Sequence, residues 1–340
     1  YASGSVTSTG DLGPFDRELV VYGLKLVGLS AIGGNPSVED EFLRKTARTV
    51  KLLLDPTRPN IDRSAQLRAI NYMSGIKTIQ KIGVNKYDSY NPSLDSGKYV
   101  GWDSVNDNYK NTDFIWQYQY TEERDGQREN TGTNQVTESL EHLLHTLTHF
   151  ALPGAYPEQF QLKSPDGLLY EALNEAIANG VYNPSDYENL SKKTFDFQKV
   201  AMTEYLFCLT YAQWGYISKY VEGGSLGGEW SDSHLTKASI QKDNPLGESL
   251  YEDYINKVIS KPSSDILNEI YKDKNQGLSG YASDTSKEFS GNSFDYKFFN
   301  LGFGRYGVRS DAGGEIDSLT GVSAVQFDDQ ALNLANDVKA

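Results

Sequence analysis

The chain has 340 residues, with 32 Lys and Arg against 46 Asp and Glu, so its formal net charge is −14. This acidity argues against nucleic acid as a partner, because neutralising phosphates requires clustered cations, and against docking on anionic lipid. No stretch approaches the ~18 consecutive apolar residues of a membrane span, and the 23 Tyr and 14 Phe can fill a core. We therefore expect a globular protein rather than a disordered or membrane-spanning one.

The single cysteine, Cys208, excludes an intrachain disulfide. Its apolar neighbours favour a buried filler over a reactive thiol. The chain begins at Tyr1 and has two Met, which is typical of a processed piece. High acidity and 31 Gly without a disulfide fit a secreted bacterial protein at least as well as a cytosolic one. We expect an extracellular or cell-surface location.

The first third of the chain mixes loops with two helices. Residues 1–16, rich in Ser, Gly and Thr, predict a flexible N-terminal arm or an edge strand. Helical spacing of apolar residues follows from about 37 to 54 and from about 62 to 73. Residues 84–112 have little periodicity and predict a long surface loop, whereas the alternating aromatic segment 113–120 predicts a strand.

The middle of the chain is dominated by helical patterns, and the end by strand patterns. Helices are expected at about 136–151, 167–179, 195–220, 247–260 and 263–273, separated by Gly and Pro. Short alternating segments at 296–301, 305–309 and 322–327 predict strands joined by Gly-rich turns. The expected fold is mainly α (α+β), with a helical body over 17–285 and a β-rich region over 286–340.

Three of the four histidines lie in one predicted helical segment. At ~100° per residue, His142, His145, His149 and Glu138 fall within an arc of about 60°. The opposite side of this helix is apolar and predicts packing into a core. It carries Leu140, Leu143, Leu144, Leu147 and Phe150.

This polar face has the composition of a metal site. Three imidazoles and a carboxylate within two helical turns are suitable ligands for Zn²⁺ or another divalent transition metal. Glu204 lies in an otherwise apolar helical segment and needs a partner to offset its desolvation, so it is a further candidate ligand. The alternatives are a polar helix face with His–Glu pairs and no metal, and a Lys or Arg partner for Glu204.

The spacing of these histidines bears on catalysis. His145 and His149 keep the i, i+4 spacing of the zinc-peptidase motif H-E-x-x-H, but Thr146 occupies the position of its general base. The base is therefore expected at Glu141, or at Glu138, one turn or more earlier on the helix.

A second informative segment spans residues 311–329. Its pattern D-x-L-x-G-V-x-x-x-x-F-x-D, from Asp317 to Asp329, resembles the strand-and-turn of secreted RTX (haemolysin-type) proteins and of serralysin C-terminal regions. The resemblance implies calcium at Asp311, Asp317, Asp328 or Asp329. The calcium-binding G-G-x-G-x-D nonapeptides do not occur, and ordinary turn chemistry is the alternative.

The helical segments are also similar to secreted proteins of marine bacteria. The similarity lies in residues 40–50, 52–56, 141–146 and 229–232. It implies an extracellular location more directly than it implies any reaction.

Two functions follow from these patterns. The first is a secreted metal-dependent hydrolase, most similar to a zinc metallopeptidase, which would act on a peptide or polysaccharide with Glu141 as base. The alternative is an extracellular structural or adhesive module, such as a surface-layer or filament subunit, which self-associates and uses its metal or calcium only for stability.

Overall fold

The computed structural model describes most of the chain, in ranges that are separated by gaps. They are 6–9, 12–31, 37–85, 105, 108–118, 123–124, 127–128, 132–162, 166–187, 194–271, 286–302, 305–319, 322–334 and 337–338. Most of the predicted loop over 84–112 lies outside them.

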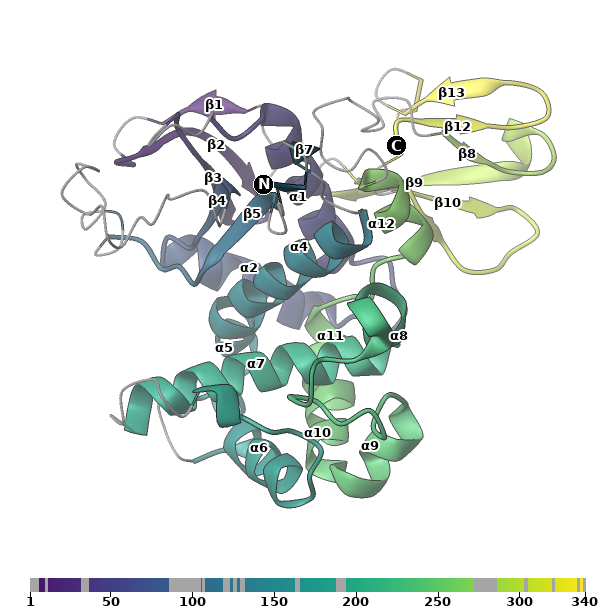
Figure 1. Ribbon diagram of the computed structural model, residues 1–340. Coiled ribbons are helices and arrows are strands. Elements are labelled where there is room, and N and C mark those ends of the chain that lie inside the picture. The colour runs from purple at the N-terminus through teal and green to yellow at the C-terminus, as the bar shows by residue number, and fades with distance from the viewer. Residues whose placement is uncertain are drawn as a thin grey trace.

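A five-stranded sheet forms the N-terminal part (Figure 1). In spatial order its strands are β1 (Thr7–Ser8), β2 (Phe15–Val21), β3 (Leu24–Leu29), β4 (Ile79–Asn85) and β5 (Phe114–Tyr118). The pairs β1–β2 and β2–β3 are antiparallel, whereas the pairs β3–β4 and β4–β5 are parallel. A separate two-stranded ribbon contains β6 (Glu123–Arg124) and β7 (Gln127–Arg128).

Local sequence explains both kinds of strand connection. Tyr22 and Gly23 both have positive φ, as a two-residue hairpin turn requires. A Cβ on Gly23 would lie 2.6 Å from the backbone oxygen of Ile70, so glycine is needed there. The parallel pair β3–β4 needs a crossover, which contains α1 (Asp40–Leu53) and α2 (Arg63–Gly75). Both predicted N-terminal helices are thus confirmed.

The helical part is built around two long helices. The first runs through α4 (Gly132–Thr146), a π-helix (Leu147–Ala151) and α5 (Leu152–Ala155). The second is α7 (Thr194–Trp214), which crosses below α4 in Figure 1. α7 ends at Gly215, whose φ of 71° turns the chain, and α8 (Ile217–Tyr220) follows. The predicted helix over 195–220 is therefore two helices.

Shorter helices complete this part. They are α6 (Leu168–Ala178), α9 (Lys237–Asp243), α10 (Pro245–Leu250), a π-helix (Tyr251–Ile255), α11 (Asn256–Val258), α12 (Ser264–Ile270) and 3₁₀ turns at Ser185–Tyr187 and Glu222–Gly224. Helix α9 was not predicted, although Thr236 and Ser239 form a capping box at its start. The other helices lie where helical spacing predicts them.

The C-terminal part contains two three-stranded sheets. One has the order β11 (Asp317–Ser318), β10 (Arg305–Ser310), β9 (Tyr296–Gly302), and a 3₁₀ turn (Ser293–Asp295) precedes β9. The other has the order β13 (Ala331–Asn333), β12 (Ala324–Gln326), β8 (Ser286–Glu288). Their small core is separate from the large one shared by the N-terminal sheet and the helices, and its buried members are Val308, Leu319, Val325, Phe327, Leu334 and Val338.

The expected helical body over 17–285 needs one correction. Its helices are confirmed, but it also contains the strands β2 to β5, so the fold mixes helix and sheet from the start. In residues 1–16 the predicted edge strand is found at Thr7–Ser8, and β2 already begins at Phe15. The apolar run from Leu19 to Leu29 forms strands because its residues are buried against α1 and α2. No helix in the described part of the chain is both long and apolar enough for a membrane crossing.

Candidate metal centre

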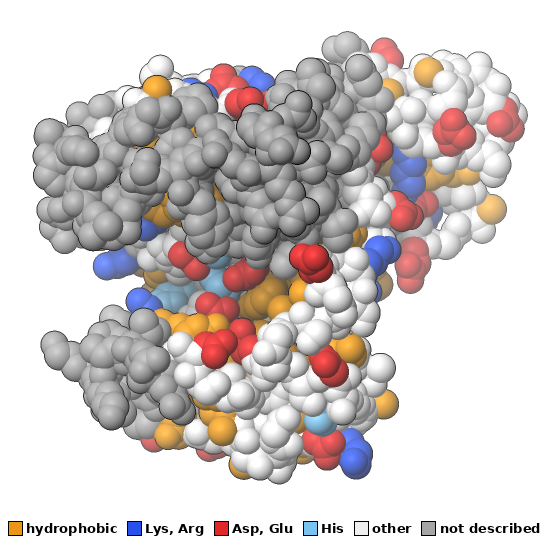
Figure 2. Space-filling model, viewed as in Figure 1, with side chains coloured by type: hydrophobic (Ala, Val, Ile, Leu, Met, Phe, Trp, Pro, Cys, Tyr) orange, Lys and Arg blue, Asp and Glu red, His pale blue; other side chains and the backbone are white. Residues whose placement is uncertain are grey.

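Helix α4 presents its two faces as the sequence predicts. The apolar face is fully buried, with Leu140, Leu143, Leu144 and Leu147 all at 0% exposure. On the opposite face, the side chains of His142 and His145 are 11% and 2% exposed. Figure 2 shows histidine and acidic side chains together in a hollow at the middle of one face of the molecule.

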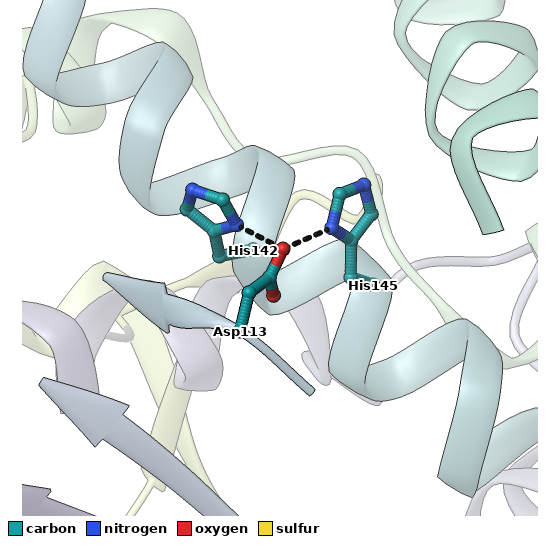
Figure 3. Close-up of side chains that lie close together, drawn as sticks. All are labelled: Asp113, His142 and His145. Carbon is teal, nitrogen blue, oxygen red and sulfur yellow. Dashed lines mark hydrogen bonds and ion pairs between the residues drawn. The ribbon is translucent and has the colours of Figure 1, made fainter. Parts of the chain in front are cut away.

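Both imidazoles point at one carboxylate that the sequence analysis did not select. Asp113 lies immediately before β5, and its Oδ2 atom is 3.0 Å from Nδ1 of His142 and 3.2 Å from Nδ1 of His145 (Figure 3). The Asp113 side chain is 46% exposed, so the group opens on one side. These three side chains form one of two clusters with the geometry to hold a metal ion among the described residues.

The other nitrogen of each imidazole faces a second carboxylate. Nε2 of His142 lies 3.2 Å from Oε1 of Glu138, and Nε2 of His145 lies 3.1 Å from Oε2 of Glu204. Glu138 is 1% exposed, and its Oε1 also accepts the backbone N–H of Trp116 at 3.0 Å. Carboxylates that hold the outer nitrogen of a metal-binding histidine are a common feature of metal sites, because they set the ring orientation and tautomer.

Two buried polar atoms of this cluster lack a hydrogen bond. One is Oε2 of Glu138, and the other is Nδ1 of His142, whose 3.0 Å contact with Asp113 lies outside hydrogen-bond geometry. Buried polar atoms without a partner are rare in folded proteins. A cation beside Nδ1 of His142 would satisfy that atom, so the donor set fits a divalent transition metal.

Without a metal, the network holds protons. Burial lowers the pKa of His142 and His145, but the carboxylates around them outweigh it, so the pKa of His142 is raised well above its ordinary value and that of His145 to about 10. Desolvation opposes ionisation of Asp113, yet the two imidazoles hold the pKa of that carboxyl well below its usual range. A divalent cation would therefore replace protons on binding.

Glu141 lies beside this network in the second cluster. A carboxylate oxygen of Glu141, a ring nitrogen of His145 and a carboxylate oxygen of Glu204 lie within 4.8 Å of one another. Burial raises the pKa of Glu141 to about 7, with the two imidazoles opposing the increase and Glu138 and Glu204 adding to it. A carboxyl group with a pKa near neutrality is suited to proton transfer.

His149 is not brought into either cluster, contrary to the predicted ligand set. Its Nδ1 lies 3.5 Å from Oγ1 of Thr203, and its ring contacts that of Phe150 at 4.5 Å between centroids. His149 lies in the π-helix Leu147–Ala151, whose wider turn rotates it away from the face that regular α-helical spacing predicts. The convergent pair is thus His142 and His145, three residues apart.

Thr146 has a structural role in the observed geometry. Its hydroxyl donates to Oε1 of Gln80 on β4 at 2.6 Å and lies 2.9 Å from that of Thr112. A glutamate at this position would point toward the sheet. The similarity in spacing to H-E-x-x-H therefore does not describe this site.

The remaining candidate residues lie apart. Asp311 pairs with Lys297, and Asp317 with Lys287. Asp328 accepts the Gly291 N–H, and Asp329 accepts both the N–H and the hydroxyl of Ser293. The structure does not bring these four carboxylates into one group, and each serves a turn or an ion pair. Cys208 is fully buried, as expected.

Asp113 is the residue that sequence reasoning missed. The only signal was its place, since a carboxylate directly before a buried aromatic strand is held at a defined edge of the sheet. Comparison with known proteins adds nothing to this assignment, since no family model, curated protein or solved structure matches the chain.

Proposed function

We propose that the protein is a zinc-dependent hydrolase of the metallopeptidase type. The observation that carries the proposal is the arrangement of two imidazoles on α4. Both direct Nδ1 at Oδ2 of Asp113, and both have Nε2 held by a carboxylate. Two histidines and one carboxylate are a common ligand set of catalytic zinc.

The side chains divide into two roles in this proposal. Asp113, His142 and His145 are the ligands. Glu138 and Glu204, which the sequence analysis treated as ligands, hold the outer nitrogens and so keep both Nδ1 lone pairs directed at the metal. The exposed side of Asp113 leaves room for water and substrate, as in catalytic rather than structural zinc sites.

The chemistry requires an activated water and a base. Zinc supplies a Lewis acid that lowers the pKa of bound water toward neutrality. Glu141 accepts a proton from the attacking water, because burial raises its pKa to about 7 and its carboxylate lies close to His145. The substrate is a peptide or a polysaccharide, and a test must include both.

The metal is tested by elemental analysis of protein loaded with zinc and then dialysed. We expect about one zinc per chain in the wild type, as for a mononuclear catalytic site. We expect none in His142→Ala or His145→Ala. Glu204→Gln should retain the site with about 10–100-fold lower affinity, because only the orientation of His145 is lost.

The remaining histidines provide matched controls. His149→Ala should bind zinc as the wild type does, because His149 belongs to neither cluster. His234→Ala should retain both zinc and hydrolysis, since His234 pairs with Asp243 away from the site. Wild-type protein that binds no zinc, or His145→Ala with full hydrolysis of casein and of a polysaccharide panel, would contradict the proposal.

A second candidate function is the extracellular structural or adhesive module. It is favoured by the exposed edge strand β1 and by Phe294, which is 72% exposed in the C-terminal region. Mass photometry with and without calcium distinguishes it, because a subunit of an assembly grows beyond one chain. An extracellular location, and calcium at the C-terminal aspartates, stay predictions that rest on the sequence resemblance.

A further inference from the structure

A cavity of about 580 Å³ lies beside the candidate metal centre. Residues from α2, from the segment before β5, from the π-helix, from 160–162 and from α7 line it. Its volume lies within the range of small-molecule sites. None of the residues that form the zinc cluster lines it, so it is a separate feature of the molecule.

Part of the cavity lining is apolar and aromatic. Phe150, Phe160 and Leu162 are buried in the fold and reach its surface. Tyr72 on α2 also lines the cavity and is 44% exposed, one of the few large aromatic side chains in the described part of the chain that face solvent. These apolar side chains would exclude water from an apolar group of the size of a benzene ring.

The cavity lining also carries positive charge. Lys110 and Lys199 line the cavity together with His149. The hydroxyl of Thr203 donates to the carbonyl of Lys199 at 2.8 Å and lies 3.5 Å from Nδ1 of His149. Lys199 therefore lies one helical turn before Thr203, the residue of α7 that contacts His149. No Asp or Glu is among the described lining residues, although the chain has a net charge of −14. The local charge is therefore opposite to that of the whole protein.

The cavity also lies at the right place for a substrate. α7 contacts the helix of the histidines twice, through Glu204 with His145 and then through Thr203 with His149. The two contacts come from adjacent residues of α7 and from histidines four residues apart on the other helix. Asn111 lines the cavity two residues before Asp113. The cavity and the metal centre are thus neighbours along the same segments of the chain.

We propose that this cavity binds the part of the substrate that combines an aromatic or large apolar group with a negative charge, such as a C-terminal Phe or Leu carboxylate. The apolar lining residues contact the apolar group of the substrate, and Lys199 with Lys110 binds its anion. The proposal rests on the proposed function for its use in catalysis, but the binding itself needs no metal. The proposal narrows the substrate class to molecules that carry both a large apolar group and a negative charge.

Calorimetric titration of the protein with two probes tests this. 3-Phenylpropanoate carries the ring and the charge, and 3-phenylpropanamide has nearly the same shape without the charge. In EDTA-treated protein we expect the carboxylate to bind at least tenfold more tightly than the amide. Lys199→Met should reduce this preference, because only Lys110 then remains, whereas Lys199→Arg should retain it.

Two further variants complete the design. Tyr72→Ala should weaken both probes equally, because it removes apolar contact only. Lys242→Met is the matched control, since Lys242 is a surface lysine on α9 outside the cavity, and it should bind as the wild type does. Equal affinity for the two probes, absence of binding, or a Lys199→Met variant that keeps the full preference would overturn the proposal. Zinc content is measured separately, so failure of the cavity and failure of the metal site are distinguishable.

Discussion

Glu141 lies on α4 one residue before the proposed metal ligand His142, and burial raises the pKa of Glu141 to about 7. At neutral pH a substantial fraction of the Glu141 carboxyl is ionised and can accept a proton. The protonated form can then donate this proton again. Few carboxyl groups have this property, because most ionise near pH 4.

The variant Glu141→Gln tests whether Glu141 accepts a proton in the reaction. The amide keeps the shape of the side chain but cannot accept a proton, so we expect kcat to fall by about 10²–10⁴-fold. Zinc content should stay at the wild-type value, which distinguishes a base from a ligand. Loss of zinc in parallel with activity would instead place Glu141 in the metal shell.

At the scale of elements, the site depends on the contact between α4 and the sheet. Trp116 on β5 donates its backbone N–H to Glu138, which in turn holds His142. The Trp116 ring packs over Gly83 of the neighbouring strand β4, where a Cβ would lie 2.3 Å from the nearest ring atom. The absence of a side chain at position 83 thus allows the strand geometry that supports the site.

We therefore expect Gly83→Ala to be destabilising by about 1–3 kcal/mol, because the ring or the strand must move. Gly75→Ala is the matched control. Gly75 ends α2 with no atom within 4 Å of an added Cβ, so alanine there should be neutral or stabilising by up to about 1 kcal/mol. Urea unfolding monitored by Trp fluorescence measures both, and equal stability of the two variants would refute the steric argument.

For the whole molecule, the buried histidines make stability depend on pH. The pKa of His145 is about 10 in the folded metal-free protein, against an ordinary value of 6.5. A raised folded pKa means that the contribution of the protonated form is fully present below about pH 6.5. It is lost as pH rises from there toward 10.

The melting temperature of EDTA-treated protein should therefore fall between pH 6.5 and 9, and His145→Gln should show a smaller fall. Zinc should act in the opposite direction, since its ligands bind in the unprotonated state. The stabilisation by zinc should then increase over the same range. Differential scanning calorimetry at several pH values checks both trends, and a metal-free melting temperature that is flat from pH 6.5 to 9 would contradict the first.

Most helices, the C-terminal strands and the two faces of α4 are predictable from the sequence, because these features follow from local periodicity and from Gly and Pro breaks. It also identified His142, His145, Glu138, Glu141 and Glu204 as parts of one polar group, since four of them share one helix.

The remaining features depend on how distant segments of the chain pack together. The apolar run from Leu19 to Leu29 is a hairpin because α1 and α2 cover it. His149 leaves the site because a π-helix interrupts the α-helical spacing, and Asp113 enters it because β5, which begins at the next residue, packs against α4. These outcomes depend on contacts between residues far apart in the chain, and no local pattern records them.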